Sequence, residues 1–476
     1  MLKKIIYKGL GVACLALSLT ACVTPSAIQK TENRSVPASY VNSQDTTNTG
    51  TAGWRSYFAD PNLAALIDTA LQRNQELNIT LQEIEISKNE VRTRKGEYLP
   101  SVGIRTGAGV DKVGRFTNIG AMVANTNIEG DRAMPEPVPD FLVGAFASWE
   151  VDVWHKLRNA KKAAVYRYLS SVEGRNFMVT NLISEIADGY YELLALDSEL
   201  AIVQQNIDLQ QNALRIVKVQ KEATRVTELA VRRFEAQLLH TQRLQYDIQQ
   251  QIVETENHLN FLVGRFPQPI VRNEGAFEQL TPAKVQAGIP TQLLANRPDI
   301  KQAELELAAA KLDVKVAKAM FYPSVGITAG IGYQAFNPSF LLNPESLLYT
   351  LAGDLAAPLV NRNALKASYY SANAKQLQAV FNYERTILNA YIEVVNQVSK
   401  IDNLEKSYDL KAREVAALNQ SVSISKDLFS SARADYMEVL LTQREALEAK
   451  FELIETKKEQ LNARVQVYRA LGGGWQ

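Results

Sequence analysis

The chain has 476 residues, of which 46% are hydrophobic and 22% are charged, and its formal net charge is +1. This length and composition suit one large ordered domain or several small ones, and they exclude a disordered tail. Because the charge is nearly balanced, the composition gives no reason to expect nucleic acid or another polyanion as a partner.

The first 21 residues are predicted to be a signal peptide. Three lysines precede an apolar run at 10–19, which is too short to span a bilayer as a helix. The sequence Leu-Thr-Ala-Cys that ends at Cys22 then resembles a bacterial lipobox, which implies that Cys22 is the first mature residue and carries lipid. An ordinary signal peptide cleaved nearby is the alternative. Residues 22–53 are rich in Ser, Thr, Asn and Gln, and we expect a lipidated tether there.

Cysteine usage limits how the mature chain is stabilised. Both cysteines, Cys14 and Cys22, lie in this leader segment. An exported chain with no later cysteine cannot form internal disulfides, so its core must come from packing or assembly. No later stretch reads as a transmembrane helix.

The remainder of the chain contains one unit twice. Residues 99–110 read LPSVGIRTGAGV and residues 322–333 read YPSVGITAGIGY, at an offset of 223 positions. Further along the offset becomes 208, so the first copy has fifteen more residues, which we place in a loop at 111–140. Two copies indicate a duplication rather than a solenoid array. The expected boundaries are a first repeat at 54–264, a linker at 265–290 and a second repeat at 291–476.

Long helices are predicted in both repeats. Residues 140–266 contain no Pro, and residues 354–471 contain no Gly and one Pro. Apolar residues recur every seven positions, which is the pattern of left-handed coiled-coil packing; the two series are Ile186, Leu193, Leu200, Ile207, Leu214 and Val394, Ile401, Tyr408, Val415, Val422. A helix over 159–222 would be about 95 Å long at 1.5 Å per residue. A rod-like soluble coiled coil would explain these segments alone.

Four other segments alternate apolar and polar side chains. Residues 102–111 and 325–334 place apolar side chains on one face, with glycine and polar residues on the other, and 143–152 and 347–356 follow the same pattern. Ten-residue alternation of this kind is typical of a membrane barrel strand, although ordinary half-buried strands would also show it. The paired glycines lack the third glycine of a nucleotide-binding loop, so we reject that reading.

Four strands cannot close a membrane barrel, because an open sheet edge is not tolerated in lipid and small barrels begin at about eight strands. Strands from several chains must therefore combine, and three chains would supply twelve. The predicted fold class is mainly α with a membrane β-barrel: an internal two-fold repeat with four transmembrane strands and long coiled-coil helices per chain.

The residues at this point resemble the TolC-like outer-membrane efflux channels, in their lipoprotein (NodT-type, RND pump-associated) branch. The resemblance runs from Trp54 to Gln476 and rests on the motifs WRSYFADP at 54–61, SWEVD at 148–152, NRPDI at 296–300, the two PSVGI segments, and the ending YRALGGGW at 468–475. It implies a homotrimer, with a twelve-stranded barrel in the outer membrane and an α-helical tunnel through the periplasm. It also implies two partners, a periplasmic adaptor and an inner-membrane RND-type pump.

The resemblance also points to a gate where the helical hairpins turn. Thr224 and Ala432 stand where the family usually has a tip glycine, which is a departure from its pattern. Near the second tip, Asp435 and Glu438 would gather carboxylates around the axis of a trimer, and a ring of this kind attracts cations. Tyr436 is expected to pack at this seam, and Arg225 or Arg433 of neighbouring tips to pair with the acids. A solvated helix face is the alternative.

No catalytic, metal or cofactor site is predicted. The three histidines, His155, His240 and His258, are scattered, with no Cys or carboxylate at metal-binding spacing. No nucleophile elbow or phosphate-binding loop occurs. We therefore expect no enzyme. The preferred function is a passive exit duct for pump substrates, located in the outer membrane and extending into the periplasm; the alternatives are a polypeptide secretion channel and a periplasmic scaffold lipoprotein without a pore.

Overall fold

The structure is a computed structural model that describes residues 25–40, 46–128, 132–273, 275–280, 286–358, 360, 362–431 and 433–475. The predicted signal peptide, Cys22 and Ala432 lie outside the described residues. The chain divides into two compact units, and each unit takes segments from both sequence repeats. Unit 1 contains residues 25–31, 85–169 and 305–381, and unit 2 contains residues 32–84, 170–304 and 382–475.

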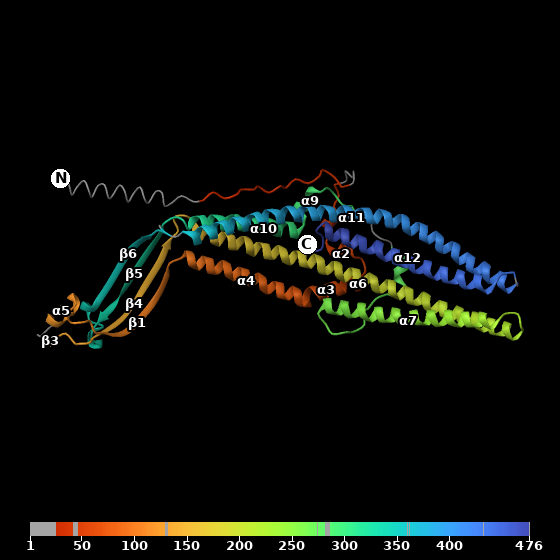
Figure 1. Cartoon of the computed structure of the whole chain (residues 1–476), viewed down its shortest axis with the longest axis horizontal. Coiled ribbons are helices and arrows are strands. Elements are labelled where there is room, and N and C mark those ends of the chain that lie inside the picture. Colours follow the sequence, from red (N-terminus) through yellow and green to blue (C-terminus); the bar gives the residue numbers. More distant parts are fainter. Residues whose placement is uncertain are drawn as a thin grey trace. The chain divides into compact units, whose positions relative to one another are not determined.

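The two repeats fold into the same series of elements (Figure 1). The first comprises α4 (Gln75–Tyr98), β1 (Ser101–Asp111), β4 (Val138–Val151), α6 (Lys156–Glu222) and α7 (Glu228–Val263). The second comprises α10 (Pro298–Ala319), β5 (Ser324–Ala335), β6 (Leu347–Ala356), α11 (Asn363–Ser430) and α12 (Tyr436–Ala470). Helices α6 and α11 are 67 and 68 residues long, which confirms the prediction of very long helices.

Short elements fill the connections. Helices α2 (Trp54–Tyr57) and α3 (Pro61–Arg73) precede the first repeat, and α8 (Ala276–Gln279) and α9 (Thr291–Asn296) lie between the repeats. The link from β1 to β4 holds α5 (Asn118–Asn125), β2 (Asn127–Ile128) and β3 (Arg132–Ala133), whereas the link from β5 to β6 holds two short 3₁₀ turns. The additional residues of the first copy therefore form the longer strand connection, as the sequence predicts.

In unit 1 the four long strands form one antiparallel sheet in the order β1–β4–β5–β6. The central pairing of β4 with β5 joins the two repeats, with Ala145 opposite Ile331 and Gly144 opposite Gly332. Strands β1 and β6 lie at the two edges of the sheet (Figure 1).

Strand β4 differs from the prediction, because it begins at Val138 instead of near residue 143. The added residues include Pro139, which cannot donate a hydrogen bond to a neighbouring strand. In the structure, Pro139 lies opposite Val110 of β1, and the pairing with β5 starts only at Phe141. This end of β4 has a neighbour on one side only, and a proline is tolerated there.

In unit 2 a buried apolar cluster holds α3, α6, α7 and α12 together; its fully buried members include Leu63, Ile67, Ile183, Tyr190, Leu193, Leu259 and Tyr468. The entry to α3 is fixed by Asp60, whose carboxylate accepts hydrogen bonds from the backbone N–H groups of Asn62 and Leu63. Gly264 ends α7 with a φ of 74°, and a Cβ there would lie 2.4 Å from the carbonyl oxygen of Arg73.

The predicted heptad residues face the packed side of the helices. Ile186, Leu193, Ile207 and Leu214 are all buried on α6. On α11 Val394 is buried, but the later members of the series, from Ile401 to Val422, are only half-buried within one chain. Among the described helices, none combines the length and the apolar character needed to cross a membrane.

Candidate functional site: the sheet faces and the hairpin ends

The sheet of unit 1 has one face of almost entirely apolar side chains and one face where glycine and polar residues predominate. The apolar face carries residues 102, 104, 106, 108 and 110 of β1, the odd-numbered residues 141–151 of β4, the odd-numbered residues 325–333 of β5 and the odd-numbered residues 347–355 of β6. Thr106 is its one polar side chain. Ile104 is 82% exposed, Tyr349 82% and Leu351 79%, so within one chain this face has no covering layer. Such a surface suits hydrocarbon rather than water.

The polar face is formed by the alternate residues and is lined by small side chains. Gly330 makes room for an aromatic ring, because a Cβ there would lie 2.7 Å from Phe146. The guanidinium of Arg105 lies 5.3 Å from the centre of the same ring. Gly326 likewise leaves space for the carboxylate of Asp354 on the adjacent strand. This face therefore combines low side-chain volume with charged groups, as expected beside water.

The first hairpin end lies between α6 and α7. Thr224 has a φ of 57°, in the left-handed region where a side chain is strained. The backbone N–H of Thr224 donates to the carbonyl of Lys221, and that of Arg225 donates to the carbonyl of Gln220. These two bonds form a Schellman motif, whose usual residue at the left-handed position is glycine. The departure noted in the sequence is therefore a threonine that adopts the conformation of the missing glycine.

We predict that Thr224→Gly stabilises the protein by about 1 kcal/mol, because glycine adopts the left-handed conformation without the Cβ clash. The thermal midpoint of the purified protein in detergent should rise. Ala223→Gly is the control, since residue 223 precedes the left-handed position and gains nothing from glycine. A lower midpoint for Thr224→Gly than for the control would contradict the strain.

The second hairpin end carries most of the predicted gate residues. Asp435 is the residue that immediately precedes α12, and Glu438 lies in its first turn, where a negative charge is favourable. Asp435, Glu438, Arg433 and Arg225 are all exposed, and none of them belongs to an ion pair in the described part of the chain. Pairing between neighbouring tips therefore stays a prediction about the assembled protein.

Tyr436 lies differently from the charged residues, because it packs on a small apolar cluster that joins the two hairpins. The buried members of this cluster are Leu214, Val217, Ala230, Val231 and Phe234, and Tyr436, Leu440 and Phe429 pack against it from the second hairpin. The ring thus has a packing role within one chain, in addition to the predicted role at the seam.

Sequence reasoning missed the ion pairs that do form at the first hairpin end. Glu228 lies 2.8 Å from Arg232 and also pairs with Lys221 across the turn. The hydrogen bond from Lys221 is the main cause that lowers the pKa of Glu228. The pair with Arg232 could have been predicted, because acidic and basic residues four positions apart on a helix lie next to each other.

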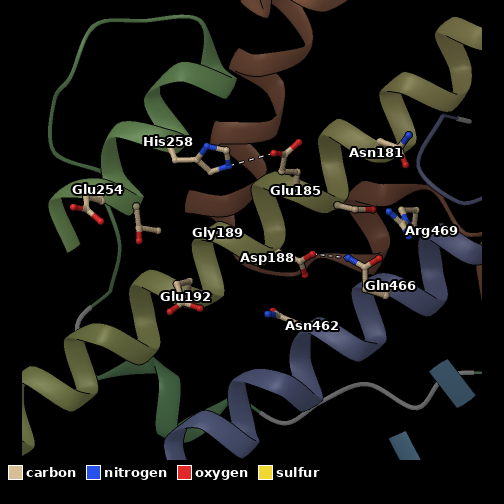
Figure 2. A pocket seen from close by; sticks show the side chains of 12 residues that line it. Asn181, Glu185, Asp188, Gly189, Glu192, Glu254, His258, Asn462, Gln466 and Arg469 are labelled. Atoms are coloured by element: carbon tan, nitrogen blue, oxygen red, sulfur yellow. Dashed lines mark hydrogen bonds and ion pairs between the residues drawn. The ribbon is translucent and has the colours of Figure 1, made fainter. Parts of the chain in front are cut away.

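A polar pocket of about 580 Å³ lies in unit 2 among α6, α7 and α12 (Figure 2). Its lining includes Glu185, Asp188 and Glu192 of α6, His258 of α7 and Asn462, Gln466 and Arg469 of α12. The Nε2 of Gln466 donates to Oδ2 of Asp188 at 2.5 Å, and His258 lies 3.2 Å from Glu185. Oδ1 of Asp188 and Oδ1 of Asn462 are both buried without a hydrogen-bond partner.

Burial raises the pKa of Asp188 from 3.8 to about 7, against the opposing effects of Gln466 and Arg469. The folded state therefore binds a proton that the unfolded state has already released, and stability is lost as the pH rises from 4 through 7. The loss is on the order of 4 kcal/mol at most.

We predict that Asp188→Asn, which mimics the protonated acid, flattens the dependence of the thermal midpoint on pH between 5 and 8. Asp402→Asn is the control, because Asp402 is exposed and paired with Lys406 at 2.6 Å. An unchanged slope in the Asp188 variant would show that Asp188 does not take up the proton.

The three histidines remain dispersed. His155 has a φ of 61° before α6, while His240 and His258 both lie on α7, as the helical pattern predicts. Within the described residues, no three His, Cys, Asp or Glu side chains are grouped so that they could hold a metal ion.

Comparison with known proteins identifies the fold and the family together. The sequence model for outer membrane efflux proteins matches residues 66–265 and 289–473. The cation efflux system protein CusC of Escherichia coli is 26% identical over 97% of this chain and 98% of its own length. The pyoverdine export outer membrane protein OpmQ of Pseudomonas aeruginosa is 29% identical over 89% and 87%.

Solved structures show the same fold. A crystal structure of CusC superimposes with a TM-score of 0.81 at 24% identity, covering 94% of this chain and 99% of that one. The open state of the MtrE outer membrane channel of Neisseria gonorrhoeae gives 0.81 at 22% identity, covering 95% and 99%.

Proposed function

The chain belongs to the outer membrane efflux protein family, and we propose that three copies form the exit duct of a tripartite efflux system. In this role the duct passively carries substrates across the periplasm and the outer membrane. An inner-membrane RND-type pump delivers the substrates, and a periplasmic adaptor joins the pump to the duct. Cys22, at the end of the predicted lipobox, would anchor the N-terminus through lipid.

The observation that carries this proposal is the sheet of unit 1. One face is apolar and exposed, the opposite face is polar and lined by small residues, and both edge strands lack a second neighbour among the described residues. In a membrane every backbone hydrogen bond must be satisfied, so β6 of one copy has to pair with β1 of the next. Three copies give twelve strands, which is enough to enclose a water-filled lumen.

The relatives support a duct without a selective substrate site. CusC is named for cation efflux, OpmQ for pyoverdine export and SrpC of Pseudomonas putida for solvent efflux. One fold that serves cargoes so different in size and charge is best explained by selection at the pump. We therefore assign no substrate to this chain and expect the pump to determine it.

Two measurements on the purified full-length protein test the proposal. Light scattering, corrected for detergent, should give the mass of three chains, and insertion into planar bilayers should produce discrete conductance steps. A monodisperse monomer would overturn the barrel and the tunnel together. A trimer without conductance would favour the scaffold alternative, and unchanged drug susceptibility of a deletion strain would favour polypeptide secretion.

We predict that the resting channel conducts poorly and prefers cations, because Asp435 and Glu438 would place six carboxylates around the axis of a trimer. The double variant Asp435→Ala/Glu438→Ala should reduce the cation preference, measured as the reversal potential in a salt gradient. Asp208→Ala/Glu414→Ala removes two exposed acids that lie about four turns before the hairpin ends and should have a smaller effect. Equal reversal potentials for the wild type and the first variant would leave these acids as solvated surface residues.

A further inference from the structure

Basic side chains gather where the helices of unit 1 meet the strands. The segments 88–98, 153–169, 308–322 and 362–370 contain fourteen Lys and Arg but three Asp and Glu, in a chain whose net charge is +1. All four segments adjoin the same end of the sheet, since each strand continues directly into or out of one of them. This end of the sheet therefore carries a strong local positive charge.

Part of this charge forms a stripe that is repeated in the duplication. Lys88, Arg92 and Lys95 lie on α4, and Lys311, Lys315 and Lys318 lie on α10 at the offset of 223 positions. Spacings of four and three residues place each trio on one face of its helix. Each stripe ends six residues before its strand, in the last turn of its helix, since α4 ends at Tyr98 and α10 at Ala319. We call these two trios the basic stripes.

The three acids within these segments pair with arginines that lie outside the stripes. Arg94, which lies outside the stripe, pairs with both Glu90 and Glu97 at 2.8–2.9 Å. The third acid, Asp313, pairs with Arg167 of α6.

Within the stripes, Lys88 pairs with Glu85 at 2.7 Å and Arg92 bonds to the neutral Asn89. Lys95, Lys315 and Lys318 are exposed and form no ion pair in the described part of the chain. The ends nearest the strands are thus the uncompensated ends.

Two features beside the stripes favour an orientation toward lipid, and the first is the position of Ala27. Ala27 packs against the cluster of Ala317, Phe321 and Tyr369, to which Val314 of α10 also belongs as a partly buried neighbour. Because Ala27 follows Cys22 by five residues, a lipid on Cys22 would enter the membrane close to the stripe on α10.

Aromatic side chains at the same level support this orientation. Trp154 stacks on Tyr322 with ring centres 4.8 Å apart, is 47% exposed, and donates its indole N–H to the carbonyl of Pro323 at 2.7 Å. Exposed Trp and Tyr rings are typical of the boundary between hydrocarbon and headgroups.

We propose that the two basic stripes bind the phosphates of anionic phospholipid headgroups in the periplasmic leaflet of the outer membrane. The proposal rests on the proposed function, because it needs the apolar face of the sheet to lie in the bilayer. Headgroups extend roughly 5–8 Å beyond the hydrocarbon core. Lysines six residues from the strands are placed to reach them, since long basic side chains extend toward the interface. A trimer would present six such stripes around its circumference.

The test uses the purified full-length protein in detergent micelles that contain increasing amounts of phosphatidylglycerol, with the thermal midpoint as readout. The midpoint should rise with phosphatidylglycerol but not with phosphatidylcholine of the same acyl chains. In Arg92→Gln/Lys95→Gln/Lys315→Gln/Lys318→Gln, the apparent affinity should fall by more than tenfold, since each cation near an anionic surface contributes about fivefold. High salt should likewise reduce the rise in thermal midpoint that phosphatidylglycerol produces in the wild type, because salt screens the attraction.

Two variants serve as controls. Lys218→Gln/Lys426→Gln removes one lysine pair that is also repeated in the duplication, at the offset of 208, but lies near the hairpin ends. It should respond to phosphatidylglycerol like the wild type. Lys95→Arg/Lys318→Arg keeps the charge and should keep the response. Soluble glycerol 3-phosphate distinguishes a lipid surface from free phosphate, and it should produce no shift.

Three results would overturn the proposal: an undiminished lipid response in the quadruple variant, an equal response to phosphatidylcholine, or an equal shift with glycerol 3-phosphate. An altered reversal potential in the quadruple variant would also overturn it, because that would place the stripes in the lumen. The wild-type protein is assayed for bilayer conductance in parallel. Absent conductance therefore counts against the duct, and an absent lipid response with normal conductance counts against the stripes alone.

Discussion

Leu351→Arg is expected to prevent stable assembly of the channel in the outer membrane. Leu351 lies near the middle of β6, is 79% exposed and points from the apolar face of the sheet. An arginine facing hydrocarbon near the bilayer midplane costs about 2–4 kcal/mol per chain, and a trimer carries three copies. Little trimer should therefore remain in detergent-solubilised outer membranes, as judged by native electrophoresis.

Thr350→Arg is the matched control, because it adds the same charge one residue earlier on the polar face, opposite Gly330. There the guanidinium would lie in water, so the amount of trimer should be nearly that of the wild type. If both variants assemble equally well, the two faces of the sheet are not divided between hydrocarbon and water. If only Thr350→Arg loses the trimer, the face that carries Thr350 would be the one in contact with lipid.

Most of the fold could be predicted from the sequence because its elements are long and periodic. The alternation at 102–111, 325–334 and 347–356 agrees with β1, β5 and β6 to within one residue at each end. The predicted helix at 159–222 agrees with α6, which begins at Lys156. The predicted strand at 143–152 misses the first five residues of β4, where Pro139 is accepted because this end has a neighbour on one side only.

The charged sites were less predictable, for two different physical reasons. The pocket around Asp188 joins α6, α7 and α12, which are far apart in sequence, and no periodic pattern records such a contact. The predicted gate at Asp435 and Glu438 concerns charges that meet only between copies, so a single chain leaves them exposed. The basic stripes were not predicted, although Lys88 with Lys311 and Lys95 with Lys318 align within the duplication, because their position beside the strands emerges only from the fold.

The motif NRPDI at 296–300 owes its form to a buried cation. Arg297 is only 6% exposed, and all three nitrogens of its guanidinium donate hydrogen bonds. It donates two bonds to Asp299, at 2.7 and 3.0 Å, one to Glu393 of α11 at 2.8 Å, and one to the carbonyl of Ala470 at 2.7 Å. One side chain therefore ties the beginning of α10 to α11 and to the end of α12 within unit 2.

Arg297→Ala is expected to destabilise the protein by about 3 kcal/mol, because it leaves the half-buried carboxylate of Asp299 and the carbonyl of Ala470 without their donor. Arg469 still pairs with Glu393, so the loss falls mainly on Asp299 and on the carbonyl of Ala470. Chemical denaturation should show the lower stability, and hydrogen exchange should accelerate at the end of α12.

Arg413→Ala is the control, because Arg413 also pairs with a carboxylate, Asp409, but both side chains are exposed. An exposed pair contributes at most about 1 kcal/mol. If the two variants lose equal stability, burial does not distinguish the two arginines, and the Arg297 network is not what joins the helices of unit 2.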